Sequence, residues 1–157
     1  MLDIGCFEGE LFQQVKKIKY GIGIDPFLDN IIKTDRYILL PGYFPDALKK
    51  EEKFDAITML AVIEHIPKKK LSELANIITK YLHQAGKLII TVPSPKVDHI
   101  IDLLMFLKIL DGMDVDAHYG YDYTETEKIF TENGFLKLIK HQKFQLGLNN
   151  LFVFEKQ

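Results

Sequence analysis

The sequence predicts a doubly wound α/β domain built on a mostly parallel sheet with an antiparallel terminal strand, and three observations support this prediction. A short apolar segment runs directly into a glycine-bearing turn within residues 1–9. The segment Phe54–Leu60 is apolar almost throughout, which is typical of a central parallel strand buried on both faces. Two alternating segments near the end of the chain, Leu136–Phe144 and Asn150–Glu155, predict an antiparallel pair at the edge of the sheet.

The first nine residues predict a strand and a tight turn, followed by a helix. Leu11, Val15 and Ile18 are spaced as one face of a helix, so we expect a helix over Glu10–Ile18. Glycines allow the backbone to approach a ligand, and free amide groups at the start of a helix face it. This arrangement is typical of a cradle for a nucleotide cofactor, although a plain strand-to-helix turn has the same pattern.

A second apolar segment, Tyr20–Ile24, ends in Asp25 and Pro26, and Asp25 follows Asp3 by 22 positions. A carboxylate at the end of the second strand, about 20 residues after a glycine turn, hydrogen-bonds the ribose diol of a bound nucleotide. The alternative is a solvated loop aspartate. The glycine turn that precedes Asp25 favours the ribose role.

The middle of the chain predicts further strands with short connections. Phe27–Asp35 is short for a crossover helix, although its apolar residues keep helical spacing. Arg36–Leu40 is the expected third strand, ended by the turn Pro41–Gly42, and Asp46–Glu52 should form a short helix or a polar loop. Ligands bind at the carboxyl ends of such parallel strands. The residues expected at these ends are Gly5, Asp25, Gly42 and Leu60.

Helical spacing predicts a helix over 71–82 with Gly86 as its C-terminal cap, followed by a fifth strand, Lys87–Val92. Val97–Leu110 is apolar nearly all round, so we expect a helix that other structure covers. Core packing is the first explanation, and a homodimer contact or an apolar substrate wall are the alternatives. Thr124 should then cap another helix, with Glu127 completing a capping box, and that helix should close at Asn133 and Gly134.

Composition limits the classes of function. The 157 residues, 47% hydrophobic and 27% charged, fit a single domain over 1–157. A net charge of −2 argues against a broad nucleic-acid surface. A single cysteine, Cys6, excludes an internal disulfide and favours a cytoplasmic protein, and no apolar run approaches the roughly 18 residues of a membrane span. The histidines lack the close spacing of metal ligands, so no metal site is predicted.

Four segments resemble, in order and spacing, the motifs of class I S-adenosylmethionine-dependent methyltransferases. They are Leu2–Gly9, Gly21–Asp25, Phe54–Pro67 and Gly86–Pro93. Within the third, Glu64-His65-Ile66-Pro67 is similar to the small-molecule branch typified by quinone-biosynthesis methyltransferases. The resemblance covers nearly the whole chain. It implies a Rossmann-like, seven-stranded type of sheet and transfer of a methyl group to a small-molecule acceptor, through an O, N or C nucleophile that stays open.

The resemblance also implies a cofactor site for S-adenosylmethionine. Gly5, Phe7 and Gly9 would cradle its methionine part, while Asp25 would bind the ribose. Asp3 would order the glycine turn and meet the amino group of the donor. The remaining expected members are the small turn residue Cys6, Pro26, Gly42 and Leu60 at strand ends, and Tyr43 and Phe44 at the adenine.

Two departures from the family pattern favour a second hypothesis. Phe7 stands where the middle glycine belongs, and Tyr43 stands where the family often has an aspartate beside the adenine. Met1 stands almost inside the first strand, so the helices that usually precede it are expected to be absent. The alternative is therefore a truncated or non-catalytic module that binds the cofactor. An NAD-dependent oxidoreductase is a third hypothesis, because Asp25 would suit that ribose too.

Methyl transfer from a sulfonium is a direct displacement, so the protein mainly positions the two reactants. A hydroxyl acceptor would benefit from a base. His65, after the fourth strand, and His118, in the loop expected to face the acceptor, are the candidates. The alternative role for His65 is to fix its loop through hydrogen bonds, and His118 could be a simple exposed loop residue.

Overall fold

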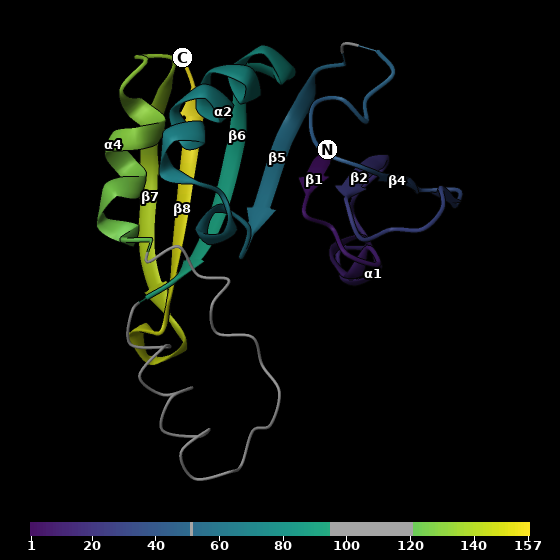
Figure 1. Cartoon of the computed structure of the whole chain (residues 1–157), viewed down its shortest axis with the longest axis horizontal. Helices are drawn as coiled ribbons and strands as arrows, with labels where there is room; N and C mark the ends of the chain where they lie inside the picture. Colours follow the sequence, from purple (N-terminus) through teal and green to yellow (C-terminus); the bar gives the residue numbers. More distant parts are fainter. Residues whose placement is uncertain (51, 95–120) are drawn as a thin grey trace, which may run out of the picture.

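The computed structural model describes residues 1–50, 52–94 and 121–157, which form one sheet with helices packed on it (Figure 1). The strands are β1 (Leu2–Ile4), β2 (Gly21–Asp25), β3 (Ile32–Lys33), β4 (Tyr37–Pro41), β5 (Phe54–Leu60), β6 (Leu82–Pro93), β7 (Leu136–Phe144) and β8 (Asn149–Lys156). The helices are α1 (Glu10–Gln14), α2 (Lys68–Tyr81) and α4 (Thr126–Thr131), with the 3₁₀ turns η1 (Ile63–His65), η3 (Tyr123–Glu125) and η4 (Gln145–Gly147). The expected helix Val97–Leu110 lies outside the described residues.

The strand order is β3-β4-β2-β1-β5-β6-β8-β7. The five strands β4, β2, β1, β5 and β6 pair in parallel, whereas β3 pairs antiparallel with β4 and β8 pairs antiparallel with both β6 and β7. The predicted doubly wound, mostly parallel sheet with its antiparallel terminal pair is confirmed. Relative to the expected seven-stranded type, the additional strand among the described residues is the two-residue β3.

Two apolar clusters of unequal size hold the sheet. The larger lies under α2 and α4, where side chains such as Leu71 and Phe130 pack on β1, β2, β5, β6 and β8. The smaller consists of Cys6, Phe12 and Leu39 under α1. Most of the described apolar core therefore lies on the α2 side, and α1 covers only the strands around β2.

Strand β2 shows that α1 and α2 lie on opposite faces of the sheet. Side chains alternate between the faces along a strand. Ile22 and Ile24 belong to the larger cluster under α2. A Cβ on Gly21 would lie 2.2 Å from Phe12 Cε1, and one on Gly23 would lie 2.6 Å from Cys6 Sγ. Glycine is needed at both positions because the α1 layer packs directly on the backbone of β2.

We therefore expect Gly21→Ala to lower the free energy of unfolding by roughly 1–3 kcal/mol, the usual effect of overpacking a close-packed core. Urea unfolding followed by circular dichroism measures this. Phe12→Leu in the same chain should recover part of the loss, because the ring atoms nearest to the added methyl group are removed. Losses that simply add in the double variant would contradict a direct contact.

Helix α1 is shorter than the expected Glu10–Ile18, because it ends at Gln14. Val15 has ψ 87°, which is outside the helical range. Arg36 Nη2 donates to the Phe12 main-chain oxygen at 3.0 Å, so this oxygen has a side-chain partner where a longer helix would bond it to the next turn. Phe12 is the buried residue of α1, and the expected apolar face of Leu11, Val15 and Ile18 is wrong.

The connections on either side of β4 contain no helix among the described residues. Ile31 and Ile32 keep helical spacing, but Ile32–Lys33 pairs antiparallel with β4 as a short return strand. Residues 27–35 are thus too short for a crossover helix, as expected, and the helical spacing of their apolar residues does not produce one. Between β4 and β5, the Ala47 amide donates to the Tyr43 oxygen and the Leu48 amide to the Pro45 oxygen, each at 2.9 Å, in turns that do not continue into a helix. Of the two forms expected for Asp46–Glu52, the described residues 46–50 and 52 form the polar loop.

Gly86 does not cap a helix, because α2 ends at Tyr81 and β6 begins at Leu82. Ala85 takes the left-handed conformation with φ 58°. A Cβ on Gly86 would lie 2.8 Å from the His83 main-chain oxygen in its own turn and 3.2 Å from the Phe54 main-chain oxygen of β5, so the close backbone on both sides requires glycine.

The predicted cap at Thr124 is also wrong. The Asp122 side chain accepts a hydrogen bond from the Thr124 amide at 2.9 Å, and it caps the turn η3. Helix α4 begins at Thr126, one residue later than a cap at Thr124 would place its first residue. The expected closure at Asn133 and Gly134 is confirmed, because Gly134 takes φ 73° and its amide donates to the Thr131 oxygen at 2.9 Å.

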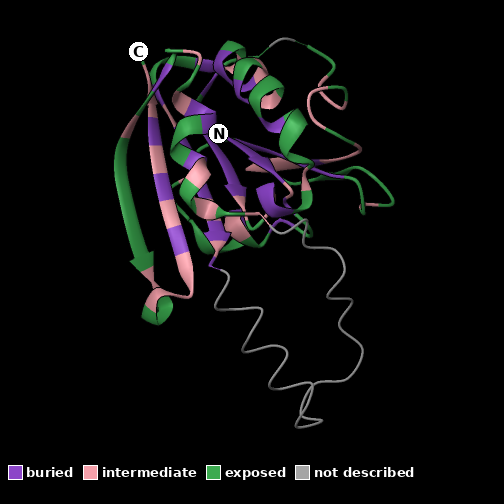
Figure 2. Ribbon diagram, turned by 60° about the vertical axis from the view of Figure 1, so that its left-hand side comes forward, coloured by how far each residue is buried: buried purple, intermediate pink, exposed green. Residues whose placement is uncertain are grey.

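The terminal pair β7 and β8 forms as predicted, with Leu136 opposite Lys156 and Phe144 opposite Asn149. Strand β7 is the outer strand of the sheet, and most of its length is exposed (Figure 2). The pairing register shifts between Leu138 and Lys140, which marks a bulge. Exposed lysines follow this strand at 137, 140 and 143.

Candidate functional site

The residues expected at strand ends lie at one edge of the sheet. Gly5 follows β1, Asp25 ends β2, Gly42 follows β4 and Leu60 ends β5. These four strands are neighbours in the order β4-β2-β1-β5 and run in parallel, so their carboxyl ends share an edge. This is the edge at which doubly wound sheets bind ligands.

The turn after β1 has a left-handed backbone at alternate residues. Gly5, Phe7 and Gly9 have φ 76°, 45° and 82°. Phe7 therefore adopts the conformation that a glycine at the middle position of the family pattern supplies more easily, at a cost of roughly 1–2 kcal/mol for a residue with a Cβ. Its ring is 58% exposed. A Cβ on Gly5 would lie 2.4 Å from Val62 Cγ2, so the turn packs closely against the segment after β5.

The Asp25 carboxylate binds two main-chain amides. Its Oδ2 accepts from the Phe7 amide at 2.8 Å, and its Oδ1 accepts from the Phe27 amide at 2.9 Å. Asp25 is only 5% exposed. The expected ribose-binding carboxylate is thus also the group that fixes the glycine turn.

Asp3 is a second buried carboxyl group at this edge. Thr58 Oγ1, on the neighbouring strand β5, donates to Asp3 Oδ1 at 2.5 Å. Burial raises the pKa of Asp3 to about 7, although the Thr58 hydrogen bond lowers the pKa and the charges of Asp25 and Glu10 raise it further. A nearby cation would therefore favour the ionised form of Asp3.

Cys6 is buried beneath the turn and packs against Phe12 and Leu39. Burial raises the pKa of its thiol to about 12, with the charges of Asp3 and Asp25 adding to the effect. This environment fits the expected role of a small packing residue, because a nucleophilic cysteine needs an accessible thiolate.

We expect Cys6 in the folded protein to react with a thiol reagent at pH 8 at least about tenfold more slowly than in the unfolded chain, since the thiolate is the reactive species. Absorbance with an aromatic disulfide reagent, with and without 6 M urea, measures both rates. Equal rates would contradict the burial of this thiol.

The two aromatic residues expected at the adenine point in different directions. Tyr43 is 73% exposed. Phe44 packs edge-on against Tyr81 of α2, with ring centroids 5.1 Å apart, and belongs to the large core cluster. Pro26, which directly follows the last residue of β2, is exposed. Tyr43 therefore has a ring available for stacking, whereas the Phe44 ring already has a protein partner.

Only one of the two histidine candidates lies in the described part of the chain. His65 ends η1, is exposed, and follows the carboxyl end of β5, where its amide donates to the Val62 oxygen at 3.0 Å. The preceding residue, Glu64, is buried. His118 lies outside the described residues. Among those residues, no three His, Cys, Asp or Glu side chains gather as a metal site would require.

Three contributors to this edge are not among the site residues that the sequence predicts. Phe27 is 85% exposed beside Asp25, which binds its amide. Val62 packs on Gly5, and Thr58 binds Asp3. Of these, only Thr58 had a usable signal, as a hydroxyl in the otherwise apolar end of β5.

Comparison with known proteins decides the family. Residues 1–140 match a family model described as a methyltransferase domain. The chain belongs to this family. A search of the curated proteins found no match to this methyltransferase domain.

Solved structures share the fold of this methyltransferase domain at low sequence identity. The magnesium protoporphyrin IX methyltransferase ChlM from Synechocystis PCC 6803, with bound SAH, has a TM-score of 0.67 at 14% identity, covering 99% of this chain and 73% of its own. An S-adenosylmethionine-dependent methyltransferase from Clostridium acetobutylicum has a TM-score of 0.66 at 13% identity, and the match covers 99% of this chain and 82% of that protein. The mitomycin 7-O-methyltransferase MmcR has 0.69 at 12%, covering 99% of this chain and 48% of its own.

The family match confirms the expected methyltransferase domain, and the shared fold confirms the expected Rossmann-like sheet. The quinone-biosynthesis branch stays a prediction. In the described part of the methyltransferase domain, no helix is both long and apolar enough to span a membrane.

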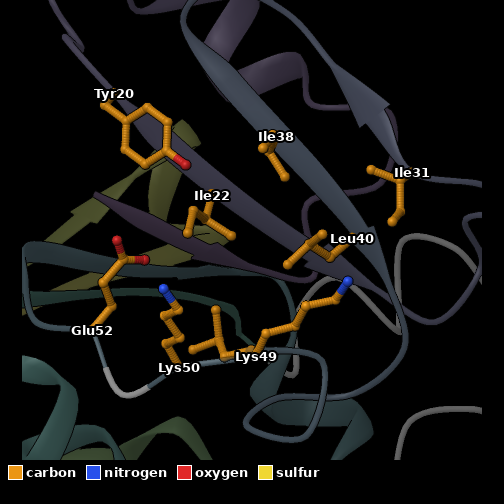
Figure 3. A pocket seen from close by; sticks show the side chains of 9 residues that line it. Tyr20, Ile22, Ile31, Ile38, Leu40, Lys49, Lys50 and Glu52 are labelled. Carbon is orange, nitrogen blue, oxygen red and sulfur yellow. The ribbon is translucent and has the colours of Figure 1, made fainter.

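The described residues also form an open pocket of about 280 Å³ on one face of the sheet (Figure 3). Ile22, Ile38 and Leu40 line its floor, and Lys49 and Lys50 lie at its rim. Ile38 and Leu40 alternate with Leu39, so the pocket lies on the face opposite α1. None of the residues expected to bind the cofactor lines this pocket. It forms where the connection between β4 and β5 provides a loop in place of a covering helix.

Proposed function

We propose that this domain transfers the methyl group of S-adenosylmethionine to a small-molecule acceptor, and that the cofactor binds at the edge formed by β4, β2, β1 and β5. The observation that carries the proposal is the turn Gly5–Gly9, whose left-handed backbone is held by Asp25. Two buried carboxyl groups, Asp3 and Asp25, lie at the same edge. Their negative potential suits a cofactor that carries a positive sulfonium and an ammonium group.

In this proposal, each part of the cofactor has a place. Gly5, Phe7 and Gly9 cradle the methionine part, with Asp3 near its ammonium group. Asp25 lies beside the ribose, and the exposed Tyr43 ring stacks on the adenine. The other expected members of the site are Cys6, Pro26, Gly42, Phe44 and Leu60, of which Cys6 and Phe44 contribute by packing.

S-adenosylmethionine supplies an electrophilic methyl group, so the protein mainly has to align the acceptor with it. The loop after β5 presents His65 at the same edge, where it could accept a proton from a hydroxyl acceptor. Two structural relatives support a small-molecule acceptor: ChlM is a magnesium protoporphyrin IX methyltransferase and MmcR is a mitomycin 7-O-methyltransferase. The nucleophile, O, N or C, stays open.

A cofactor-binding module without activity is the second candidate, and Phe7 favours it. Its exposed ring stands in a turn where the family pattern has glycine, so it occupies space beside the expected methionine part. Both candidates bind the cofactor, but only the first transfers its methyl group to an acceptor.

Calorimetric titration with S-adenosylmethionine, S-adenosylhomocysteine and NAD tests the proposal. We expect micromolar binding of the first two and a loss of at least about tenfold, or 1.4 kcal/mol, in Tyr43→Ala. Tyr20→Ala is the matched control, since Tyr20 is also an exposed tyrosine and lines the separate pocket. Binding of NAD alone would overturn the proposal. A subsequent screen of hydroxyl and amine acceptors separates the enzyme from the inactive module.

A further inference from the structure

The face of the sheet opposite α1 carries a strip of apolar side chains at the open pocket of about 280 Å³ (Figure 3). Ile22 of β2 lies opposite Ile38 of β4, and Ile31 directly precedes β3, which pairs with the other side of β4. These three residues and Leu40 form the apolar strip. Ile31 is 56% exposed. Apolar surface in contact with water is unfavourable, so the strip gains free energy when an apolar group covers it.

The loop between β4 and β5 supplies the opposite wall of this pocket. Leu48 packs against the large apolar cluster, and the next two residues, Lys49 and Lys50, are exposed at the rim. In Figure 3 the Lys50 amino group points toward the Ile22 side of the pocket, and the Lys49 amino group points toward the Leu40 side. Neither lysine forms an ion pair with another described residue. Both charges are therefore available to a ligand.

Two further polar side chains, Tyr20 and Glu52, line the pocket beside Lys50 (Figure 3). Tyr20 is 49% exposed, and its hydroxyl can donate a hydrogen bond to an anion. The exposed carboxylate of Glu52 opposes an anion. With two lysines and one glutamate among its lining residues, the pocket carries an excess of positive charge. This excess attracts a negatively charged group to the rim.

We propose that this pocket binds a small amphipathic anion, with an alkyl chain on the apolar strip and a negatively charged head group at Lys49 and Lys50. A volume of about 280 Å³ holds roughly nine groups of the size of a water molecule, at about 30 Å³ each. A methylene group is of similar size, so an alkyl chain of about eight carbons fits. None of the residues expected to bind the cofactor lines the pocket, so the inference does not rest on the proposed function.

Titration of octanoate into the ¹⁵N-labelled protein, below the concentration at which octanoate forms micelles, tests the site. We expect saturable shifts of the Ile22, Ile38 and Leu40 amides. Hexanoate should bind at least about fourfold more weakly, because it covers the strip with two fewer methylene groups. Octylammonium has the same chain and a positive head group, so it should bind at least about fivefold more weakly at low ionic strength. Equal affinities for octanoate and octylammonium, or no saturable shift at these amides, would overturn the inference.

Charge variants test the role of the rim. Lys49→Met and Lys50→Met keep an unbranched side chain without its charge, so each should weaken octanoate binding about twofold or more. Glu52→Gln removes the opposing charge and should tighten octanoate binding about twofold. Lys140→Met, on the distant edge strand β7, is the matched control and should leave the affinity unchanged. An octanoate affinity that is the same in all three rim variants as in the wild type would contradict the proposed head-group site.

Ile31→Gln tests the apolar strip, and the protein should keep its fold because this side chain is already exposed. We expect the affinity for octanoate to fall at least about threefold. Ile139→Gln is the matched control, because Ile139 is 47% exposed on β7. Sedimentation of the protein without ligand tests a different occupant of the strip, a second copy of the chain. A dimer that Ile31→Gln dissociates would assign the strip to self-association and overturn the inference.

Discussion

Replacing Asp3 by asparagine is expected to stabilise the protein at pH 8 by up to about 4 kcal/mol and to change its stability little near pH 4. The pKa of Asp3 is raised from 3.8 to about 7, chiefly by burial. Each pKa unit corresponds to about 1.4 kcal/mol. Asparagine keeps an oxygen that can accept from Thr58 Oγ1 but carries no charge, so it removes the cost of burying an anion.

The direction of this pH dependence of stability follows from the protons that the folded and unfolded chains bind. Between pH 3.8 and about 7 the folded protein keeps a proton on Asp3 that the unfolded chain releases, so this contribution to stability is present below pH 3.8 and is lost as the pH rises to about 7. Urea unfolding of both proteins at pH 4, 6 and 8 measures the difference. The exposed Asp46→Asn is the matched control. The same difference between wild type and Asp3→Asn at all three pH values would show that Asp3 is not buried as an acid.

The second large effect is expected for Gly5→Ala, which should weaken S-adenosylhomocysteine binding at least about tenfold, or 1.4 kcal/mol. The added Cβ would lie 2.4 Å from Val62 Cγ2, and alanine disfavours φ 76°. The turn or the segment after β5 must therefore move, and both lie at the cofactor edge. Overpacking should also lower the free energy of unfolding by roughly 1–3 kcal/mol.

Calorimetry measures the affinity and urea unfolding measures the stability. Val62→Ala removes the contacted methyl groups, so the double variant should regain part of both losses, while the strain at φ 76° remains. Gly147→Ala is the control for that strain, because it also has positive φ, at 83°, but has no atom within 4 Å of the added Cβ. Full binding by Gly5→Ala would contradict the placement of the cofactor at this turn.

The features that the sequence predicts correctly are those set by local pattern. The apolar run of β5 and the alternation along β7 and β8 depend on which faces are buried, and the strands form where expected. The spacing of Asp3 and Asp25 similarly places two carboxyl groups near one edge, because the parallel pairing of Ile4 with Ile24 brings the carboxyl ends of β1 and β2 together.

The features that the sequence does not predict depend on contacts between segments that are distant along the chain. Helix α1 ends early, where Arg36, 24 residues further along the chain, binds the Phe12 oxygen. Gly86 lies beside the main-chain oxygen of Phe54, 3.2 Å from where its Cβ would be, and only the folded chain brings these two residues together. In the candidate site, the amides bound by Asp25 cannot be read from side-chain identity, because every residue except proline carries one.

The exposed lysines of β7 have a consequence for self-association. An outer strand offers unpaired backbone groups to which another chain can add, and charged side chains with a bulge oppose such addition. Lys137 and Lys140 lie opposite Glu155 and Val153 on one face of β7, whereas Lys143 lies opposite Asn150 on the other face, above the Tyr123 ring. A strand that added to this edge would therefore meet positive charge on both faces, and the bulge between Leu138 and Lys140 would interrupt its pairing.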